Sequence, residues 1–217
     1  MTERFEPRVD PRPADVVWPD AQWPPPASTV LTGDTVELRP TTVDDTFDLF
    51  VALDDTRPWE YLPWEQPYKV HVMGAIVADG IATRFPWTVR LRGTGEAVGW
   101  TSFLDTNVSD ARTEIGGTQY NPSVWATKVN PETKLLLLTY AFEVLRMGRV
   151  QLKTDVRNVR SQQAIARLGA RYEGTLSRFQ RRSDGTVRDT VLFAITAEDW
   201  PQVREGLLAR LAVGSGA

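Results

Sequence analysis

Apolar residues recur along the chain in two patterns, the strict alternation of a strand and the three-to-four-residue spacing of a helix. From about residue 30, segments of the two kinds alternate. Segment 35–40 (TVELRP) has the alternation of a strand. Segment 41–53 is expected to be a helix that opens on a threonine cap and acidic residues. Its expected buried face carries Phe47, Phe50 and Val51. A second helix at 69–83 and three strands follow, and the strands are expected at 85–91, 97–104 and 111–120.

The second half repeats this alternation. A long helix is expected to run to about Met147, and RVQLKTDV (149–156) alternates as a strand should. The next segment, 158–170, has an asparagine cap and ends at Gly169, which predicts a short helix. Its core-facing residues are expected to be Ala164, Ile165 and Leu168.

The pattern closes with a hairpin and a helix. The dipeptide Asp184-Gly185 separates two alternating runs, which is a strong hairpin signal. A last helix is expected from about Ala197. Together these elements predict one domain of mixed α/β class at 30–213, preceded by a proline-rich arm at 1–29. The arm contains Trp18 and Trp23, so we expect it to pack on the domain surface.

Composition narrows the classes of protein. The chain has 217 residues, of which 41% are hydrophobic and 24% charged, an ordinary balance for a soluble domain. It has no cysteine, which excludes disulfides and thiol nucleophiles, and its single histidine, His71, argues against a metal site. The net charge of −3 predicts no general affinity for nucleic acid. No apolar run is long enough for a membrane span, and we expect a cytoplasmic protein.

The stretch SVWATKVNPETK (123–134) leads into the apolar run of the long helix. The first turn of a helix leaves about four N–H groups unpaired at the positive end of the helix dipole, where phosphate binds well. Ala126 and Thr127 are small enough to let an anion approach, and Lys128 adds a charge. Any loop from a strand to a helix has a similar appearance, so the pattern alone leaves phosphate binding open.

The stretch from Glu114 to Gly174 resembles the GCN5-related N-acetyltransferases. The resembling segments are EIGGTQY (114–120), the tryptophan loop P-x-x-W-A-T-K-V-N-P-E-T-K (122–134), and the long run that ends in RNVRSQQAIARLGARYEG. The similarity is greatest to the branch of the ribosomal-protein N-terminal acetyltransferases (RimJ/RimL-like). It implies a mixed, mostly antiparallel sheet that is flanked by helices and splayed where acetyl-CoA binds.

The resemblance also implies which residues bind acetyl-CoA. The family loop has the form (Q/R)-x-x-G-x-(G/A), and in this branch tryptophan often takes the first place. Aligned on Trp125, the glycine places are held here by Lys128 and Asn130, so both glycines are missing. A later family element, N-x-x-S before a helix that ends in L-G, is intact. The implied cofactor-binding residues are Tyr120, Trp125, Ala126, Thr127, Lys128, Val129, Asn130 and Asn158.

Acetyl transfer to an amine needs a neutral amine, and a base supplies it. The resemblance makes Glu114 the first candidate, since it lies on the strand that leads to the cofactor loop. Alternatively it is a surface residue paired with Arg112. Glu173 is the second candidate base, and its alternative is a solvated loop acid.

The other catalytic roles also follow from the resemblance. The family's tyrosine acid is replaced by Ile165, and Ser161 is the remaining candidate to protonate the thiolate, unless its hydroxyl only caps the helix. Asn158 is expected to cap that helix and to bind the pantetheine arm. A backbone N–H near Tyr120 is expected to stabilise the oxyanion.

Aromatic residues are candidates for the acceptor pocket, although such residues more often serve as packing. A cluster of arginines at 178, 181 and 182 is read as a solvated hairpin face. The candidate substrate-binding residues are Trp59, Tyr61, Trp64 and Trp87.

These observations favour an acetyl-CoA-dependent N-acetyltransferase that acts on a primary amine. The alternative is a non-catalytic protein that binds or senses acyl-CoA, which the missing loop glycines and tyrosine favour. A nucleotide-binding regulator ranks below both, because no phosphate-loop glycine motif is present. The acceptor could be a small molecule, a protein N-terminus or a lysine. The hairpin and the last helix could form a homodimer surface.

Overall fold

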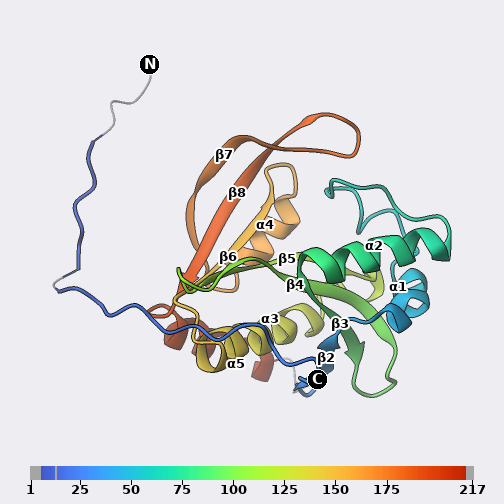
Figure 1. Cartoon of the computed structure of the whole chain (residues 1–217), viewed down its shortest axis with the longest axis horizontal. Coiled ribbons are helices and arrows are strands. Elements are labelled where there is room, and N and C mark those ends of the chain that lie inside the picture. Colours follow the sequence, from blue (N-terminus) through green and yellow to red (C-terminus); the bar gives the residue numbers. More distant parts are fainter. Residues whose placement is uncertain (1–5, 13, 214–217) are drawn as a thin grey trace.

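The alternating segments form one eight-stranded sheet with the order β1-β2-β3-β4-β5-β6-β8-β7 (Figure 1). The coordinates come from a computed structural model, which describes residues 6–12 and 14–213. All neighbouring strands pair antiparallel except β5 and β6, which are parallel, so the expected mixed and mostly antiparallel sheet is confirmed. The strands are β1 (Leu31–Thr32), β2 (Val36–Pro40), β3 (Phe85–Leu91), β4 (Ala97–Asn107), β5 (Arg112–Tyr120), β6 (Arg149–Asp155), β7 (Arg171–Arg181) and β8 (Val187–Thr196).

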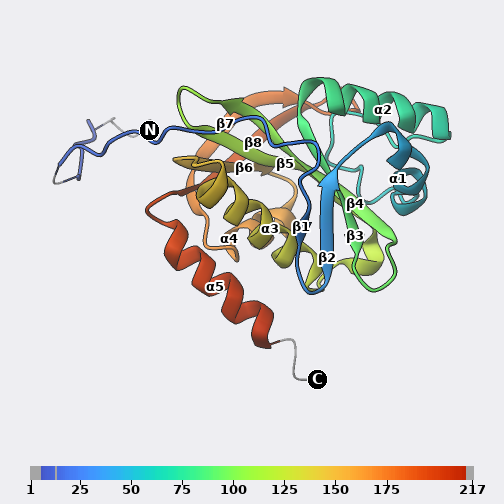
Figure 2. The ribbon, with the colours of Figure 1, turned by 60° about the horizontal axis from the view of Figure 1, so that its bottom comes forward.

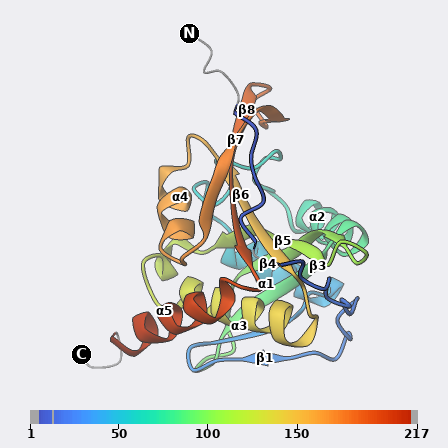
Figure 3. The same cartoon turned by 90° about the vertical axis from the view of Figure 1, so that its left-hand side faces the viewer.

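Five α-helices cover the two faces of this sheet. In Figure 3, α2 lies on one side of the strands and α4 and α5 lie on the other. Figure 2 shows α3 and α5 next to each other, as their contacts also indicate. The expected long helix is α3, and a turn of π-helix at Tyr140–Val144 continues it. The helices are α1 (Thr46–Ala52), α2 (Val70–Thr83), α3 (Val129–Thr139), α4 (Val159–Ala166) and α5 (Trp200–Val213).

Each face of the sheet has its own core. The larger core joins the sheet to α3, α4 and α5 through residues such as Leu137, Ile165 and Trp200. The smaller core joins it to α1 and α2 and contains Trp100 of β4. Successive residues of a strand point to opposite faces, so β4 contributes to both cores. We call the two sides of the sheet the α3 face and the α1–α2 face.

The buried side of α1 differs from the one expected. Phe47 is 61% exposed and Val51 is also exposed, whereas Leu49, Ala52 and Leu53 are buried. The segment is apolar at nearly every position around the helix, so its periodicity is compatible with two faces. A turn of 3-10 helix at Val43–Asp45 precedes α1, and Leu49 packs in the core formed with α2 and β4.

The later part of the arm crosses the α3 side of the domain, whereas its earlier part extends away from the fold (Figures 1 and 2). Trp23 packs edge-on against Phe85 and Phe103, and the amide of Gln22 donates to the carbonyl of Leu145 at 2.8 Å. Trp18 remains 58% exposed. The packing expected of the arm therefore holds for Trp23.

The hairpin of β7 and β8 is held to β6 by a buried ion pair. Arg182 donates two hydrogen bonds to Asp155, from Nε at 2.6 Å and from Nη2 at 2.8 Å. Both side chains are buried, so Arg182 does not lie on the solvated face expected for the arginine cluster. The hairpin turns at Gly185, which has the positive φ of 83° that the Asp-Gly signal indicates.

No helix among residues 6–12 and 14–213 combines the length and apolar character needed to cross a membrane.

Candidate functional site

The sheet opens between its two parallel strands. Pairing between β5 and β6 runs from Arg112 with Arg149 to Glu114 with Gln151. Beyond this last pair β5 continues to Tyr120 and β6 to Asp155, while β6 stays paired with β8. Glu114 therefore lies where the two strands part, and we call this place the fork.

Glu114 is a buried acid, with an exposed fraction of 4%. Its Oε2 lies 2.7 Å from Nζ of Lys153 and accepts a hydrogen bond from Gln151 at 3.2 Å. Burial raises the pKa of the Glu114 carboxyl above its usual value, although Lys153 acts in the opposite direction. The alternative of a surface residue paired with Arg112 does not hold, since Arg112 contacts Asp110 instead.

The second candidate base has a different environment. Glu173 is partly exposed, and its two oxygens accept hydrogen bonds from Arg149 at 2.7 and 2.5 Å. These bonds lower the pKa of Glu173. Arg149 belongs to the closed end of the β5–β6 pair, so Glu173 is held away from the open side of the fork. A carboxylate that is stabilised in its charged form is the weaker base.

The loop from β5 to α3 is fixed by its own hydrogen bonds. Asn121 accepts from the amide of Ser123 at 2.9 Å, and the indole of Trp125 donates to the carbonyl of Tyr120 at 3.1 Å. Ala126 has a φ of 61°, in the left-handed region. Lys128, at one missing glycine place, has an ordinary φ of −70°. The loop therefore turns at Ala126, and the missing glycines impose no strain at Lys128.

The first turn of α3 has fewer unpaired N–H groups than the usual four of a helix N-terminus. The amide of Val129 donates to Oγ1 of Thr127 at 3.2 Å, and Pro131 has no N–H. Asn130 keeps its first-turn amide. An anion at this end of α3 would therefore need contacts from the loop in addition to those from the helix.

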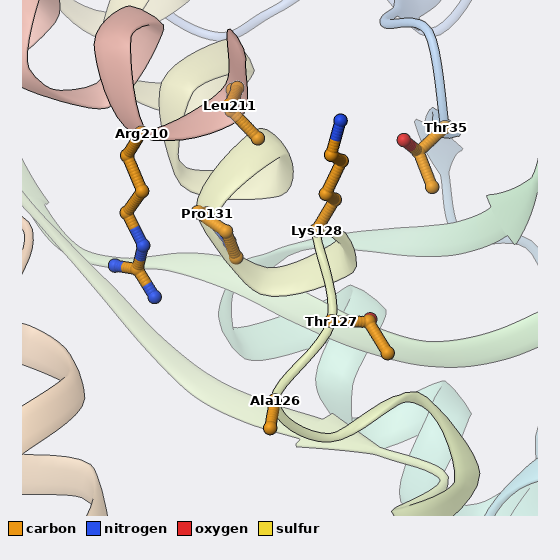
Figure 4. A pocket seen from close by; sticks show the side chains of 7 residues that line it. All are labelled: Thr35, Ala126, Thr127, Lys128, Pro131, Arg210 and Leu211. Atoms are coloured by element: carbon orange, nitrogen blue, oxygen red, sulfur yellow. The ribbon is translucent and has the colours of Figure 1, made fainter. Parts of the chain in front are cut away.

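A cavity of about 480 Å³ lies against this loop and helix end. In Figure 4, Lys128 and Arg210 lie on either side of Pro131. Arg210 comes from α5, a distant part of the chain that sequence reasoning did not connect with the loop. Two cations beside backbone amides suit a polyanion such as the diphosphate of coenzyme A. The lining residues are Thr35, Ala126, Thr127, Lys128, Pro131, Arg210 and Leu211.

The N-terminus of α4 lies close to the same loop. The side chain of Asn158 accepts a hydrogen bond from the amide of Ser161 at 2.9 Å, so the predicted asparagine cap is present. It is the amide of Ser161, not its hydroxyl, that takes part in the cap. The guanidinium of Arg160 lies 3.3 Å from the ring centroid of Trp125 and connects α4 to the loop.

Two of the aromatic residues predicted for the acceptor pocket are core residues instead. Trp59 is 3% exposed and its indole donates to the carbonyl of Leu53 at 2.9 Å. Trp87 is 0% exposed and lies on the α3 face beside Tyr140. Neither side chain presents surface to a ligand, because each fills a core. Tyr61 and Trp64 are partly exposed on the loop between α1 and α2.

Tyr120 lies beside the loop with its phenol oxygen buried and unpartnered among the described residues. Burial raises the pKa of the Tyr120 hydroxyl, so this group stays protonated. Its expected contribution to the site is the backbone N–H, because an oxyanion is stabilised by hydrogen-bond donors.

Sequence reasoning missed a buried lysine in α3. Lys134 is 5% exposed, and its Nζ donates to Oγ1 of Thr118 at 2.9 Å. Burial lowers the pKa of Lys134 to about 7. A signal was available, because Lys134 lies three and four residues before the buried Leu137 and Leu138, on the same face of the helix.

The model of the acetyltransferase (GNAT) domain matches residues 35–171, which is more than half of the chain. The chain belongs to the GNAT acetyltransferase family. No protein in a search of curated sequences matches it. The separation of β5 and β6 at the fork agrees with the splayed sheet expected of this family. GNAT acetyltransferases use acyl-CoA.

Solved structures of this family share the fold. A protein of T. thermophilus described as an acetyltransferase is 33% identical with a TM-score of 0.79, covering 88% of this chain and 100% of its own. A GNAT-family protein of Chromobacterium violaceum is 26% identical with a TM-score of 0.82, covering 91% of this chain and 100% of its own. RimJ of Mycobacterium smegmatis, solved with CoA-disulfide, is 25% identical with a TM-score of 0.71, covering 83% of this chain and 91% of its own.

Proposed function

We propose that this protein is an acetyl-CoA-dependent N-acetyltransferase of the RimJ/RimL-like branch. It transfers the acetyl group to a primary amine by direct attack in a ternary complex. The observation that carries the proposal is Glu114, a buried acid with a raised pKa at the last paired residue before β5 and β6 separate. A carboxylate with a raised pKa is a stronger base than an ordinary one.

Binding of the cosubstrate rests on the loop and on two helices. The amides of Ala126, Thr127 and Asn130 face the diphosphate, and Lys128 and Arg210 add positive charge from the walls of the cavity. The side-chain amide of Asn158 bonds the pantetheine arm, since its oxygen already caps α4. RimJ of Mycobacterium smegmatis, 25% identical, was solved with CoA-disulfide, which supports coenzyme A as the ligand class.

The reaction follows from the positions of these groups. Glu114, directly or through water, takes a proton from the acceptor ammonium, and the neutral nitrogen attacks the thioester carbonyl carbon. The amide of Tyr120 stabilises the oxyanion. When the carbon–sulfur bond breaks, the nitrogen loses its second proton, the amide product forms, and that proton neutralises the departing thiolate directly or through water. The hydroxyl of Ser161 on α4 is the candidate donor, although a thiolate with a pKa near 8.5 needs little assistance.

Glu173 remains the second candidate base. Its ion pair with Arg149 favours the charged carboxylate and so weakens its basicity. Substitution of each glutamate by glutamine separates the two. Loss of activity in Glu173→Gln alone would transfer the role of base from Glu114 to Glu173.

A thiol-release assay with a panel of amines tests the proposal. At least one amine should release free CoA faster than background hydrolysis, with the acetylated amine found by mass spectrometry. Tight binding of acetyl-CoA by calorimetry without release for any amine would identify a non-catalytic acyl-CoA-binding protein instead. No binding at millimolar acetyl-CoA would contradict both functions.

A further inference from the structure

Three buried polar groups without partners gather on the α1–α2 face. They are Nε of Arg84, Nε1 of Trp64 and Oγ of Ser102, and none has a hydrogen-bond partner among the described residues. Buried polar groups are nearly always paired in native proteins, so each exception calls for an explanation. All three can donate a hydrogen bond, and two of them can only donate. Their natural complement is an acceptor-rich, negatively charged group.

Arg84 is held between two aromatic rings. Its guanidinium carbon lies 4.8 Å from the ring centroid of Trp100 and 5.5 Å from that of Trp64. Within the described residues it forms no ion pair with a carboxylate, and burial lowers its pKa. Two aromatic faces orient a guanidinium but leave its N–H edge available. An unpaired, partly buried cation is costly to keep unless it has a ligand.

Arg188, another partly buried arginine on this face, has partners. Its Nε lies 3.1 Å from Oγ1 of Thr190 and its Nη1 lies 3.4 Å from the carbonyl of Tyr61. Arg188 is therefore partly buried but hydrogen-bonded. Arg84 is therefore the better candidate for binding an outside anion.

Two glycines of β5, Gly116 and Gly117, lie between Glu114 and Arg84. A Cβ atom added at Gly117 would lie 3.3 Å from Nη1 of Arg84 and 3.8 Å from Oγ of Ser102. A Cβ added at Gly116 would lie 2.7 Å from Oε1 of Glu114 and 2.7 Å from Cδ1 of Leu104.

Both glycines face the same side of the sheet. Ser102 and Leu104 are two residues apart on β4, so their side chains share a face. The pairing of β4 with β5 shifts between Trp100 and Ser102, opposite Gly117. Such a bulge can turn neighbouring residues to one side of the strand. Glu114 and Arg84 therefore lie at the two ends of this glycine pair, on one face of the sheet.

This face of the sheet is separate from the proposed diphosphate site. Trp100 belongs to the core of α1 and α2, whereas the α3 face of β4 is marked by Thr101, which Nζ of Lys134 approaches at 3.4 Å. An anion at Arg84 would therefore come from the acceptor.

We infer that Arg84, Trp64 and Ser102 form an anion subsite, so that the acceptor is a primary amine carrying a carboxylate a few bonds from its nitrogen. This inference rests on the proposed function. Glu114 receives the amine, and the guanidinium binds the carboxylate in a two-pronged hydrogen-bonded pair. A free amino acid and a peptide with an acidic first residue both have this chemistry.

A binding experiment tests the subsite without requiring turnover. The full chain is titrated calorimetrically, with CoA present, with N-acetylglycine, N-acetyl-β-alanine and N-acetyl-γ-aminobutyrate and with the primary amide of each. At least one acid should bind about tenfold or more tightly than its amide, as expected for a charge-assisted pair. Arg84→Gln should remove the difference. Equal binding of acid and amide, or no binding of either at millimolar concentration, would overturn the inference.

Matched variants separate recognition from folding. Arg39→Gln removes the same charge from β2, where Arg39 is exposed and paired with Glu37, and should keep the preference for acids. Arg84→Lys keeps the charge but loses the planar guanidinium, so it should reduce the preference for acids without removing it. This variant replaces Arg84→Gln in the test if Arg84→Gln fails to fold. A preference that persists unchanged in a folded Arg84 variant would also overturn the inference.

A transfer experiment distinguishes this inference from the proposed function. Glycine, β-alanine and γ-aminobutyrate are compared with their amides, and peptides beginning with Asp or Glu are compared with those beginning with Asn or Gln. Acids should be the better substrates, with the effect of Arg84→Gln mainly on KM. Transfer to neutral amines alone would retain the proposed function and overturn the subsite. Acid-selective binding without any transfer would retain the subsite and overturn the proposed function.

Discussion

Glu114 and Lys153 form an ion pair at the fork, with 2.7 Å between Oε2 and Nζ. The lysine stabilises the charged form of the buried carboxylate. The effect of burial is larger than that of the lysine, so the pKa of Glu114 is raised. Glu114 is therefore a stronger base than an exposed glutamate would be.

Replacing Glu114 with glutamine should separate activity from stability. The rate of acetyl transfer should fall about tenfold or more, because loss of a general base costs roughly a hundred- to ten-thousandfold at most sites. The free energy of unfolding at pH 7 should stay the same or rise, since a raised pKa means that burying the charged form is unfavourable. Steady-state kinetics and urea unfolding measure the two effects. Glu37→Gln, on β2 beside Arg39, serves as the control and should alter neither.

The pH dependence of the rate gives an independent check. A base must be deprotonated, so kcat/KM should fall as the pH falls through the raised pKa of Glu114. This acidic limb should lie above the usual range for a glutamate and should be absent from the residual activity of Glu114→Gln. An unchanged limb in the variant would assign it to another group, such as the acceptor amine.

Lys134 should make stability depend on pH. Its pKa is about 7 in the folded protein and near 10.4 when unfolded, so the unfolded chain holds one more proton between these values. The free energy of unfolding should therefore rise with pH across this window, by up to about 1.4 kcal/mol per unit. Denaturant unfolding at pH 7 and pH 9 measures the slope. Lys134→Met should lose this contribution, and an identical slope in the variant would contradict the assignment.

Glu132 connects the start of β2 to α3 through hydrogen bonds. From the first turn of α3 it accepts hydrogen bonds from the amides of Asp34, Thr35 and Val36 at 2.8, 2.7 and 2.7 Å. Glu132→Ala leaves these amides without partners and should cost about 2–4 kcal/mol of unfolding free energy. Glu132→Gln, which keeps one acceptor oxygen, should cost less. Chemical denaturation measures both, and equal costs would show that the oxygen retained in Glu132→Gln stabilises none of the three amides.

The secondary structure could largely be predicted because each element carries a local signal. The caps and stops at Asn158, Gly169 and Gly185 depend on neighbouring residues alone, and they lie where expected. The face of α1 could not be predicted, because its burial is decided by α2 and β4 rather than by its own apolar pattern.

The site was harder to predict, since its properties arise from distant segments. Glu114 was identified by resemblance, but its burial and its partner depend on β6, which pairs with β5 only in the fold. Trp87 has no local mark that separates a core tryptophan from a ligand-binding one. Arg84 meets Trp64 and Ser102 only because α2, a loop and β4 converge, and no spacing in the sequence indicates such a cluster.

A crystal structure of the protein with acetyl-CoA tests the central claim most directly. The diphosphate should lie against the amides of Ala126 to Asn130, near Lys128 and Arg210, and the thioester should enter the fork beside Glu114. A complex with the diphosphate bound elsewhere, or with the thioester outside the gap between β5 and β6, would contradict the account.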